Sequence, residues 1–398
     1  MSARPERISA LWFGNQAVWT AILGVFLQSR VGEVAPGNDV QAYAWIAAGG
    51  ALVAAVVQLA AGFASDRRMA RVGHRREFYA WGVALATLAL FAFFAAPTFG
   101  TLVAAFVALQ IGMNVAGGPY QAAISDAIDE DRRGRASAWM SIASSAGSVT
   151  GLIVSATLAG VAAAAALALA LVAGTALALD HLRRLPAAVM RPAALHVTGP
   201  MATVLVSRAA INVGFYTLLG FLFFFVRESL HVADARTTTG LLFLTFTAAG
   251  IVGATLTGRA ADRFDKRAVI GAAAIAITLA VGAFAFAPNV PIAFAAAAAS
   301  GCAWSAFFTA DWAIAYAVLP RDAMAAAMGV WNLAAAIPQV IAPAMTAPLV
   351  TALDAQHAGL GPRVALLLVG LEFVAGAALL WLIPAQRWER SLRYTAAE

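Results

Sequence analysis

Long apolar runs alternate with short polar segments along almost the whole chain. Each run approaches or exceeds the roughly 20 residues that an α-helix needs to cross a hydrocarbon layer. Charged residues and most prolines gather between the runs. The pattern therefore predicts an all-α integral membrane protein with twelve transmembrane helices, at about 8–30, 42–64, 78–96, 101–125, 136–158, 161–180, 201–226, 239–258, 268–287, 291–317, 325–349 and 364–384.

Composition supports a membrane protein and argues against a nucleic-acid-binding one. Hydrophobic residues make up 62% of the chain and charged residues 12%, whereas soluble domains are about half apolar and a quarter charged. The net charge of +6 comes almost entirely from arginines between the apolar runs, with Lys266 the only lysine. This basic balance therefore reflects membrane topology, and we expect the bilayer, not a nucleic acid, as the partner.

The distribution of positive charge predicts the orientation. Of the 26 lysines and arginines, Arg208 falls within an apolar run, and only four others lie on the side opposite the chain ends. Positive loops stay in the cytoplasm during membrane insertion. We therefore expect both termini to be cytoplasmic, in the cell membrane, with a bacterial inner membrane as the expected setting. The four exceptions are Arg30, Arg227, Arg236 and Arg363.

The chain contains an internal duplication. The segment Gly62–Arg76 follows the second apolar run, and a related segment, Gly258–Arg263, follows the eighth, roughly half a chain length later. Repetition at half length indicates a duplicated unit, because a solenoid would repeat every 20–50 residues or so. The predicted organisation is a six-helix bundle over 1–185, a cytoplasmic linker over 186–200 and a second bundle over 201–398.

The repeated segments carry a family resemblance. Both read G-x-x-x-D-R, which resembles the signature loop of the major facilitator superfamily; the first copy has three extra residues before its Gly-His-Arg-Arg portion, a variant similar to the glycoside-pentoside-hexuronide:cation and sucrose/proton symporter-like branches. The resemblance implies two pseudo-symmetric six-helix bundles that work by alternating access. It also implies a gating role for Gly62, Asp66, Arg67, Gly73, Arg75, Asp262 and Arg263.

Polar and aromatic residues form stripes on four predicted helices, the first, fourth, seventh and tenth. These are the helices that line the central cavity in the superfamily that the chain resembles. Each amide alone has a simpler interpretation, a hydrogen bond to a neighbouring helix, and each aromatic residue alone fits packing. The presence of such stripes on all four helices favours a substrate pathway. The predicted substrate-binding residues are Asn15, Gln16, Trp19, Asn114, Tyr120, Gln121, Asn212, Tyr216 and Trp304.

Three ionisable residues lie inside predicted spans. Arg208 in the seventh and Asp311 in the tenth fall at similar heights, so they are expected to pair. We predict that Asp311 carries a coupling proton with Arg208 as its electrostatic partner; a permanent clamp within the second half is the other interpretation. Glu372 lies mid-span in the twelfth helix, which the resemblance makes peripheral, and its expected role is structural.

The sequence favours a secondary transporter over an enzyme. It contains no Ser/His/Asp set, no metal-ligand spacing and no nucleotide-binding P-loop. We expect proton-coupled uptake of a sugar or glycoside-like solute by a monomer, without cofactor or metal. Efflux of drugs or metabolites is the alternative, although antiporters of the superfamily usually carry a Gly-Pro-rich motif where the fifth helix here has Gly147 and Gly151 but no proline.

Overall fold

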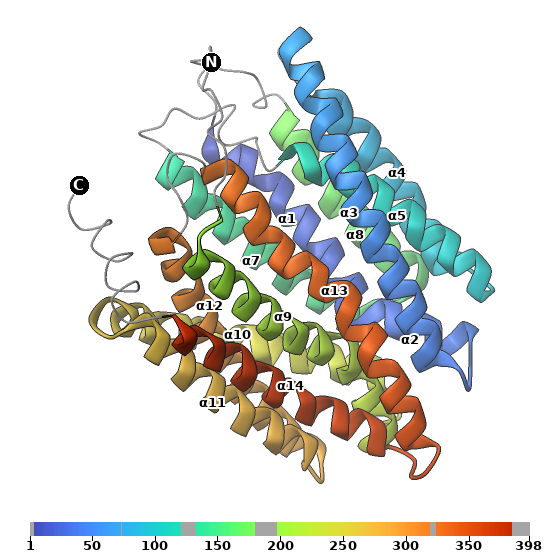
Figure 1. Ribbon diagram of the computed structural model, residues 1–398. Coiled ribbons are helices and arrows are strands. Elements are labelled where there is room, and N and C mark those ends of the chain that lie inside the picture. Colours follow the sequence, from blue (N-terminus) through green and yellow to red (C-terminus); the bar gives the residue numbers. More distant parts are fainter. Residues whose placement is uncertain (1–3, 73, 121–132, 180–196, 319–323, 384–398) are drawn as a thin grey trace. The chain divides into compact units, whose positions relative to one another are not determined.

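The regular secondary structure is entirely helical in the residues that the structure describes. A computed structural model describes residues 4–72, 74–120, 133–179, 197–318 and 324–383 (Figure 1). The chain divides into two compact units, here called unit 1 (Met1–Met190) and unit 2 (Arg191–Glu398). Most of the predicted linker, 186–200, lies outside the described residues.

Unit 1 contains six continuous helical segments in its described part. The first is an α-helix that passes through one π-helical turn, η1 (Ile22–Phe26), without a break. The helices are α1 (Pro5–Ala21), α2 (Leu27–Val34), α3 (Asp39–Val72), α4 (Arg76–Ala95), α5 (Phe99–Tyr120), α7 (Arg133–Thr157) and α8 (Gly160–Leu179).

Unit 2 repeats this organisation over its described residues, again with a π-helical turn, η3 (Phe225–Ser229), near the end of its first segment. A short 3-10 turn, η5 (Leu380–Leu382), follows its last helix. The helices are α9 (Gly199–Phe224), α10 (Ala235–Arg263), α11 (Lys266–Ala285), α12 (Val290–Val318), α13 (Met324–Asp354) and α14 (Leu360–Leu379).

The predicted membrane spans are confirmed. Within the described residues, eleven helical segments are long and apolar enough to cross a membrane, and α7 contributes a shorter apolar stretch, Ile142–Thr157. Large apolar side chains are exposed along these helices, including Trp81 (74%) and Leu88 (69%) on α4. Such exposure would be costly in water and is expected where helices face lipid. The protein therefore has an all-helical, multi-pass membrane fold.

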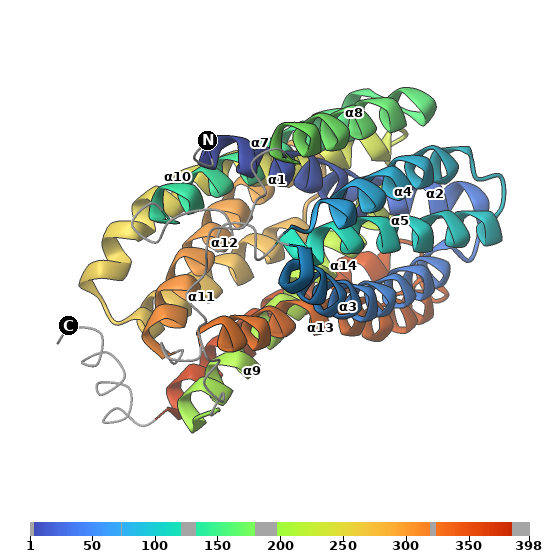
Figure 2. The same ribbon diagram turned by 90° about the horizontal axis from the view of Figure 1, so that it is seen from above.

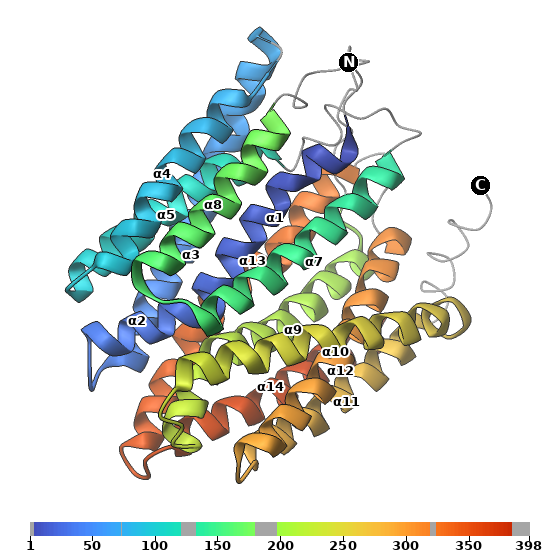
Figure 3. The same cartoon turned by 180° about the vertical axis from the view of Figure 1, so that it is seen from behind.

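The two units share one pattern of helix neighbours. In unit 1, α1 packs against α7 and α8, α5 packs against α3 and α4, and α4 also contacts α8 (Figures 2 and 3). In unit 2, α9 packs against α13 and α14, α12 packs against α10 and α11, and α11 also contacts α14 (Figure 1). Counted in chain order, these are the same pairs, as a duplicated unit requires.

Small residues let α1 and α7 approach closely. A Cβ atom added to Gly147 would lie 2.2 Å from the Phe13 carbonyl oxygen, and one added to Gly151 would lie 2.3 Å from that of Ala17. Hydrophobic burial gives little driving force between helices in lipid, so close van der Waals contact of this kind holds them together. Gly147 and Gly151 therefore lie on a helix-packing face of α7.

One feature of the sequence prediction is wrong. The signature segments were expected to be loops beginning near residues 64 and 258, but α3 continues to Val72 and α10 to Arg263. The length of an apolar run predicts only the part of a helix that crosses the hydrocarbon layer, not the residue at which the helix ends. Arginine, alanine and methionine are all good helix formers, so the charged segments continue as helix beyond the span.

The close contact of α1 with α7 yields a stability prediction. Gly151→Ala places a methyl group against the α1 backbone, and overpacking of this kind typically costs about 1–3 kcal/mol. The melting temperature of the purified protein in detergent should therefore fall.

Gly271→Ala on α11 is the matched control, because its added Cβ meets no atom within 4 Å. Replacing a helical glycine with alanine otherwise stabilises by about 0.5–1 kcal/mol, so this variant should melt at or above the wild-type temperature. Equal shifts in the two variants would contradict the packing assignment.

Candidate functional site

A buried ion pair lies at the centre of the polar residues in unit 2. Arg208 on α9 forms an ion pair with Asp311 on α12 through Nη1 and Oδ2, with only 7% and 4% of their side chains exposed. Arg208 lies about 13 Å from the start of α9, and Asp311 about 10 Å from the end of α12, at 1.5 Å per residue. The predicted contact between the two residues is confirmed.

A third helix supplies an aromatic partner for the arginine. The Arg208 Cζ atom lies 4.4 Å from the centroid of the Trp331 ring on α13, and Trp331 is fully buried. A planar guanidinium can stack on an indole face while its N–H groups bind a carboxylate. Trp331 thus gives the guanidinium a second favourable contact, independent of Asp311.

A polar column continues along α9 from the ion pair. Asn212 and Tyr216 follow Arg208 at successive helical turns. The Asn212 Nδ2 donates to the Arg208 carbonyl at 2.9 Å, and the Tyr216 hydroxyl accepts a 2.9 Å hydrogen bond from the Gln339 Nε2 on α13. With Asp311 on α12, three helices therefore contribute polar side chains along this face of α9.

An aromatic cluster packs beside this column. Phe215 stacks on Trp304, with ring centroids 4.2 Å apart and planes 13° from parallel. Phe307, Phe308 and Phe373 also contact the indole. Phe215 covers one face of the Trp304 indole, so a solute ring could stack only on the part of the indole that its neighbours leave uncovered. The substrate role of Trp304 stays a prediction.

The predicted site residues of unit 1 lie mainly on α1 and α5. Asn15 is buried, whereas Gln16 and Trp19 are partly exposed. A Cβ added to Gly117 of α5 would lie 3.9 Å from the Asn15 Nδ2, so α1 and α5 meet at this point. Asn114 of α5 donates to the Gln110 carbonyl oxygen at 2.8 Å and to its Oε1 at 3.2 Å.

Tyr120 has a clear packing role in unit 1. Its hydroxyl donates to the Ile8 carbonyl at 2.7 Å, its ring meets Trp12 edge-on at 5.1 Å, and only 3% of the residue is exposed. These contacts tie α5 to α1, and binding a solute would require the hydroxyl to leave its present acceptor. Gln121 lies outside the described residues.

The signature segment of unit 1 joins α3 to α4 through a buried arginine. Arg75 is 7% exposed and donates from Nη1 to the Ser65 Oγ at 2.9 Å, while Ser65 donates to the Gly62 carbonyl at 2.8 Å. Arg67 is exposed on α3. Gly73 and the side chains of Asp66, Asp262 and Arg263 lie outside the described residues, so their gating roles stay predictions.

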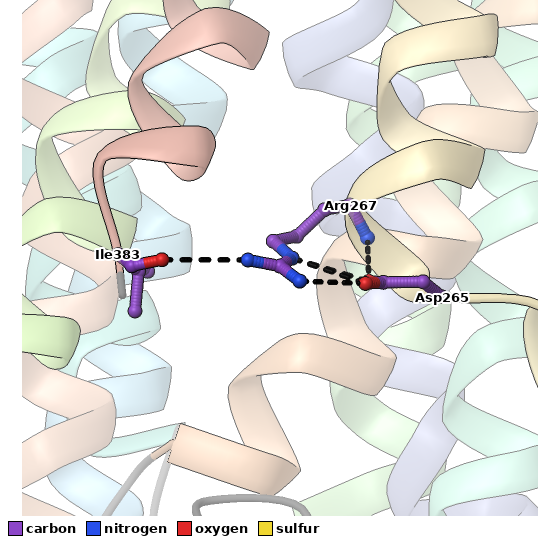
Figure 4. Close-up of polar contacts among 3 residues, drawn as sticks. All are labelled: Asp265, Arg267 and Ile383. Carbon is purple, nitrogen blue, oxygen red and sulfur yellow. Dashed lines mark hydrogen bonds and ion pairs between the residues drawn. The ribbon is translucent and has the colours of Figure 1, made fainter. Parts of the chain in front are cut away.

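A comparable contact joins the start of α11 to the end of the α14 segment in unit 2. Arg267 binds the Asp265 carboxylate, with its closest contact 2.8 Å from Nη2 to Oδ2, and donates to the Ile383 carbonyl at 3.4 Å (Figure 4). Its Cζ lies 4.9 Å from the centroid of the Trp381 ring. Asp265 also caps α11 by accepting from the Arg267 N–H.

Two further features of the described residues do not suit a polar solute or a metal ion. A groove on α1 and α8 of unit 1 is lined by alanine, leucine, glycine and phenylalanine, so it lacks the side chains to orient a polar solute. No group of three His, Cys, Asp or Glu side chains comes together as metal ligands in the described ranges.

Trp331 and Gln339 belong to a stretch that resembles the eleventh helix of sugar symporters, but they are not among the predicted site residues. Both lie on α13, and both touch residues of the α9 polar stripe. The sequence did contain a signal for them, namely a polar glutamine and a tryptophan within an apolar run. Their partners on another helix could not be inferred from spacing along their own helix.

Comparisons with known proteins agree with this architecture. The sequence profile of the Major Facilitator Superfamily matches residues 9–343, and again residues 204–393. Comparison with curated protein sequences gave no significant match.

Solved transporter structures share the fold along nearly the full chain. An occupied, inward-facing bacterial homologue of the human lysosomal transporter Spinster superposes with a TM-score of 0.75 at 16% identity, covering 98% of this chain and 96% of that one. The nucleoside transporter NupG gives 0.71 at 13% identity, covering 95% and 98%. A D-xylose–proton symporter gives 0.69 at 14% identity, covering 96% and 98%.

These structural likenesses show the fold, and the profile match covers most of the sequence in a single alignment. The transporters concerned are not enzymes. The chain therefore belongs to the Major Facilitator Superfamily of membrane transporters.

Proposed function

We propose that this protein is a proton-coupled carrier that takes up a sugar or glycoside-like solute by alternating access, with both termini in the cytoplasm. The observation that carries the proposal is the buried Arg208–Asp311 pair on α9 and α12. Ionisable side chains inside membrane spans are rare and costly, and they commonly mark ion or proton pathways.

The surroundings of the pair support a coupling role over a permanent clamp. The desolvation cost of two buried charges offsets much of their attraction, so such a pair is weak evidence for stability alone. Trp331 gives Arg208 a second contact, which lowers the cost of releasing Asp311. A carboxylate that loses its cation in a buried setting favours binding a proton. Separation of the pair would therefore load a proton, and its return would release it.

The groups beside the pair suit a hydroxyl-rich solute. Asn212, Tyr216 and Gln339 supply hydrogen-bonding atoms, and the Phe215–Trp304 stack supplies an apolar aromatic wall. Small-molecule sites typically combine a few placed polar groups with aromatic surface. Two proteins with the same fold transport D-xylose and nucleosides, so the fold accommodates sugars and sugar-containing solutes.

Efflux of drugs or metabolites is the second candidate. Antiporters of the superfamily usually carry a Gly-Pro-rich motif in the fifth helix. The corresponding helix here, α7, contains Gly147 and Gly151 but no proline. This difference favours uptake.

Ligand-dependent thermal stabilisation is the direct test of the solute class. A ligand that binds the folded state alone stabilises it by about 2.7 kcal/mol at 100 times Kd. The purified protein should be screened against D-xylose, sucrose, methyl β-D-glucoside, uridine and ethidium. The proposal expects a rise in Tm with a sugar or glycoside. Stabilisation by ethidium alone would favour efflux of cationic drugs.

Asp311→Asn should uncouple transport from the proton gradient. The amide cannot take up a coupling proton, so accumulation of the solute identified above should be lost in proteoliposomes with an imposed pH gradient, while counterflow persists. Asp234→Asn is the matched control. Hydrogen bonds from the Thr237 hydroxyl and N–H hold the pKa of Asp234 below its usual value, so this variant also removes a charge, but outside a span.

A permanent clamp makes a different prediction for the same variant. Removing one partner of a buried pair costs roughly 3–5 kcal/mol, because the other charge is left uncompensated. Under that interpretation, Asp311→Asn would melt early, and Arg208→Gln combined with Asp311→Asn would recover both stability and accumulation. Accumulation by Asp311→Asn, or by the double variant, would rule out Asp311 as the proton carrier.

Asp66→Asn should slow conformational exchange with little change in solute affinity. The expected reason is that the charged end of α3 forms contacts that must break during alternating access. Exchange would be followed by counterflow rates and affinity by ligand-dependent Tm shifts, with Asp262→Asn as the matched change in unit 2. A large loss of affinity at a normal exchange rate would show that Asp66 contributes to binding and not to gating.

A further inference from the structure

Glu372 is a membrane-embedded carboxyl group that the proposed transport mechanism does not use. It lies near the middle of the span Leu360–Leu382, about 18 Å from its start at 1.5 Å per residue. Residues around it fix the position of α14. Phe373 packs against Gly214 of α9, Gly376 packs against Ile211, and the Thr278 hydroxyl of α11 donates to the Gly370 carbonyl at 3.0 Å.

Two buried threonines connect the carboxyl to α9 and α13. The Glu372 carboxyl hydrogen-bonds the Thr217 hydroxyl, and the Thr217 and Thr346 Oγ1 atoms lie 3.5 Å apart. Thr217 and Thr346 are 0% and 2% exposed. The Glu372 Oε2 is buried and has no hydrogen-bond partner among the described residues. Three helices therefore place a carboxyl and two hydroxyls in one cluster.

In the described residues, the charged groups on the elements packed against α14 have other partners or lie in the end turns of their helices. In η3, Arg227 pairs with Glu228. On α9, Arg208 pairs with Asp311, and the Tyr216 hydroxyl accepts from Gln339. Lys266 and Arg267 lie in the first turn of α11, and Arg267 binds Asp265. Asp354, at the end of α13, accepts from the Gly361 N–H, and Arg363, in the first turn of α14, binds backbone carbonyls of Ala285, Ala287 and Ser229.

The hydroxyl chain can serve both protonation states of Glu372. When the carboxyl carries a proton, it donates to Thr217, which in turn donates to Thr346. When it is ionised, Thr346 donates to Thr217, and Thr217 donates to the carboxylate, because each hydroxyl can rotate. A neutral carboxyl group costs far less than a carboxylate inside a membrane span when no cation pairs with it.

We infer that Glu372, Thr217 and Thr346 form a proton-binding site in unit 2 that is separate from the Arg208–Asp311 pair. Along α9, Thr217 lies about 13 Å beyond Arg208 at 1.5 Å per residue. This proton-binding site goes beyond the proposed function and does not depend on which solute is transported. A result that rules out the site would leave the proposed function standing, and the reverse also holds.

Carbodiimide labelling of the purified full-length protein tests the site. Dicyclohexylcarbodiimide modifies protonated carboxyl groups in apolar surroundings, and mass spectrometry locates the adduct. Labelling of Glu372 should be strong at acidic pH and fall about tenfold for each pH unit above its midpoint. Glu77, which is partly exposed and bound to Arg68 at 2.7 Å, should stay unlabelled.

Variants and infrared spectroscopy complete the test. Thr217→Val should move the labelling curve to higher pH, because the ionised carboxylate loses its donor. Thr239→Val should not, because that buried hydroxyl binds only the Ala235 carbonyl among the described residues. The acid-minus-alkaline infrared difference spectrum should contain a protonated-carboxyl band that Glu372→Gln removes.

Three results would overturn the inference. The first is the absence of both the adduct and a band that depends on Glu372. The second is labelling that does not change with pH. The third is loss of the adduct and the band when Na⁺ is added at constant pH, which would identify the cluster as a sodium site.

Discussion

The high cost of an ionised side chain in a hydrocarbon layer is the constraint on which the account depends. It makes the Arg208–Asp311 pair informative, because neither charge would persist in a span without a partner. The pair brings α9 and α12 together, and the stack of Arg208 on Trp331 adds α13. A change in one contact therefore affects three helices, as expected of a group that links protonation to conformation.

Close backbone packing holds these helices at the required positions. In unit 2, a Cβ added to Gly253 would lie 2.1 Å from the Cys302 carbonyl oxygen, and one added to Gly301 would lie 1.9 Å from that of Phe246. These contacts join α10 to α12, the helix that carries Asp311. Unit 1 uses Gly147 and Gly151 in the same way between α7 and α1. Glycine packing thus sets how closely these helices approach within each unit.

The sequence predicted what depends on one helix at a time. Apolar length gave twelve spans, and position along two spans placed Arg208 and Asp311 at matching heights. The sequence prediction failed where a helix continues beyond its long apolar run, as α3 does to Val72. Apart from the Arg208–Asp311 pair, the contacts between helices were not predicted. Gln339 bonding Tyr216, and Thr217 bonding Glu372, depend on how helices are rotated against each other. Residue spacing within one helix carries no such information.

The most direct test of proton-coupled uptake is the proton movement that accompanies the solute. Proteoliposomes with a trapped pH-sensitive dye and no imposed gradient would receive the stabilising sugar or glycoside on the outside. The account predicts that the lumen becomes more acidic as the solute enters, because each solute carries a proton inward. A lumen that becomes more alkaline would indicate antiport, and solute entry without a pH change would indicate a uniporter; either result would contradict the account.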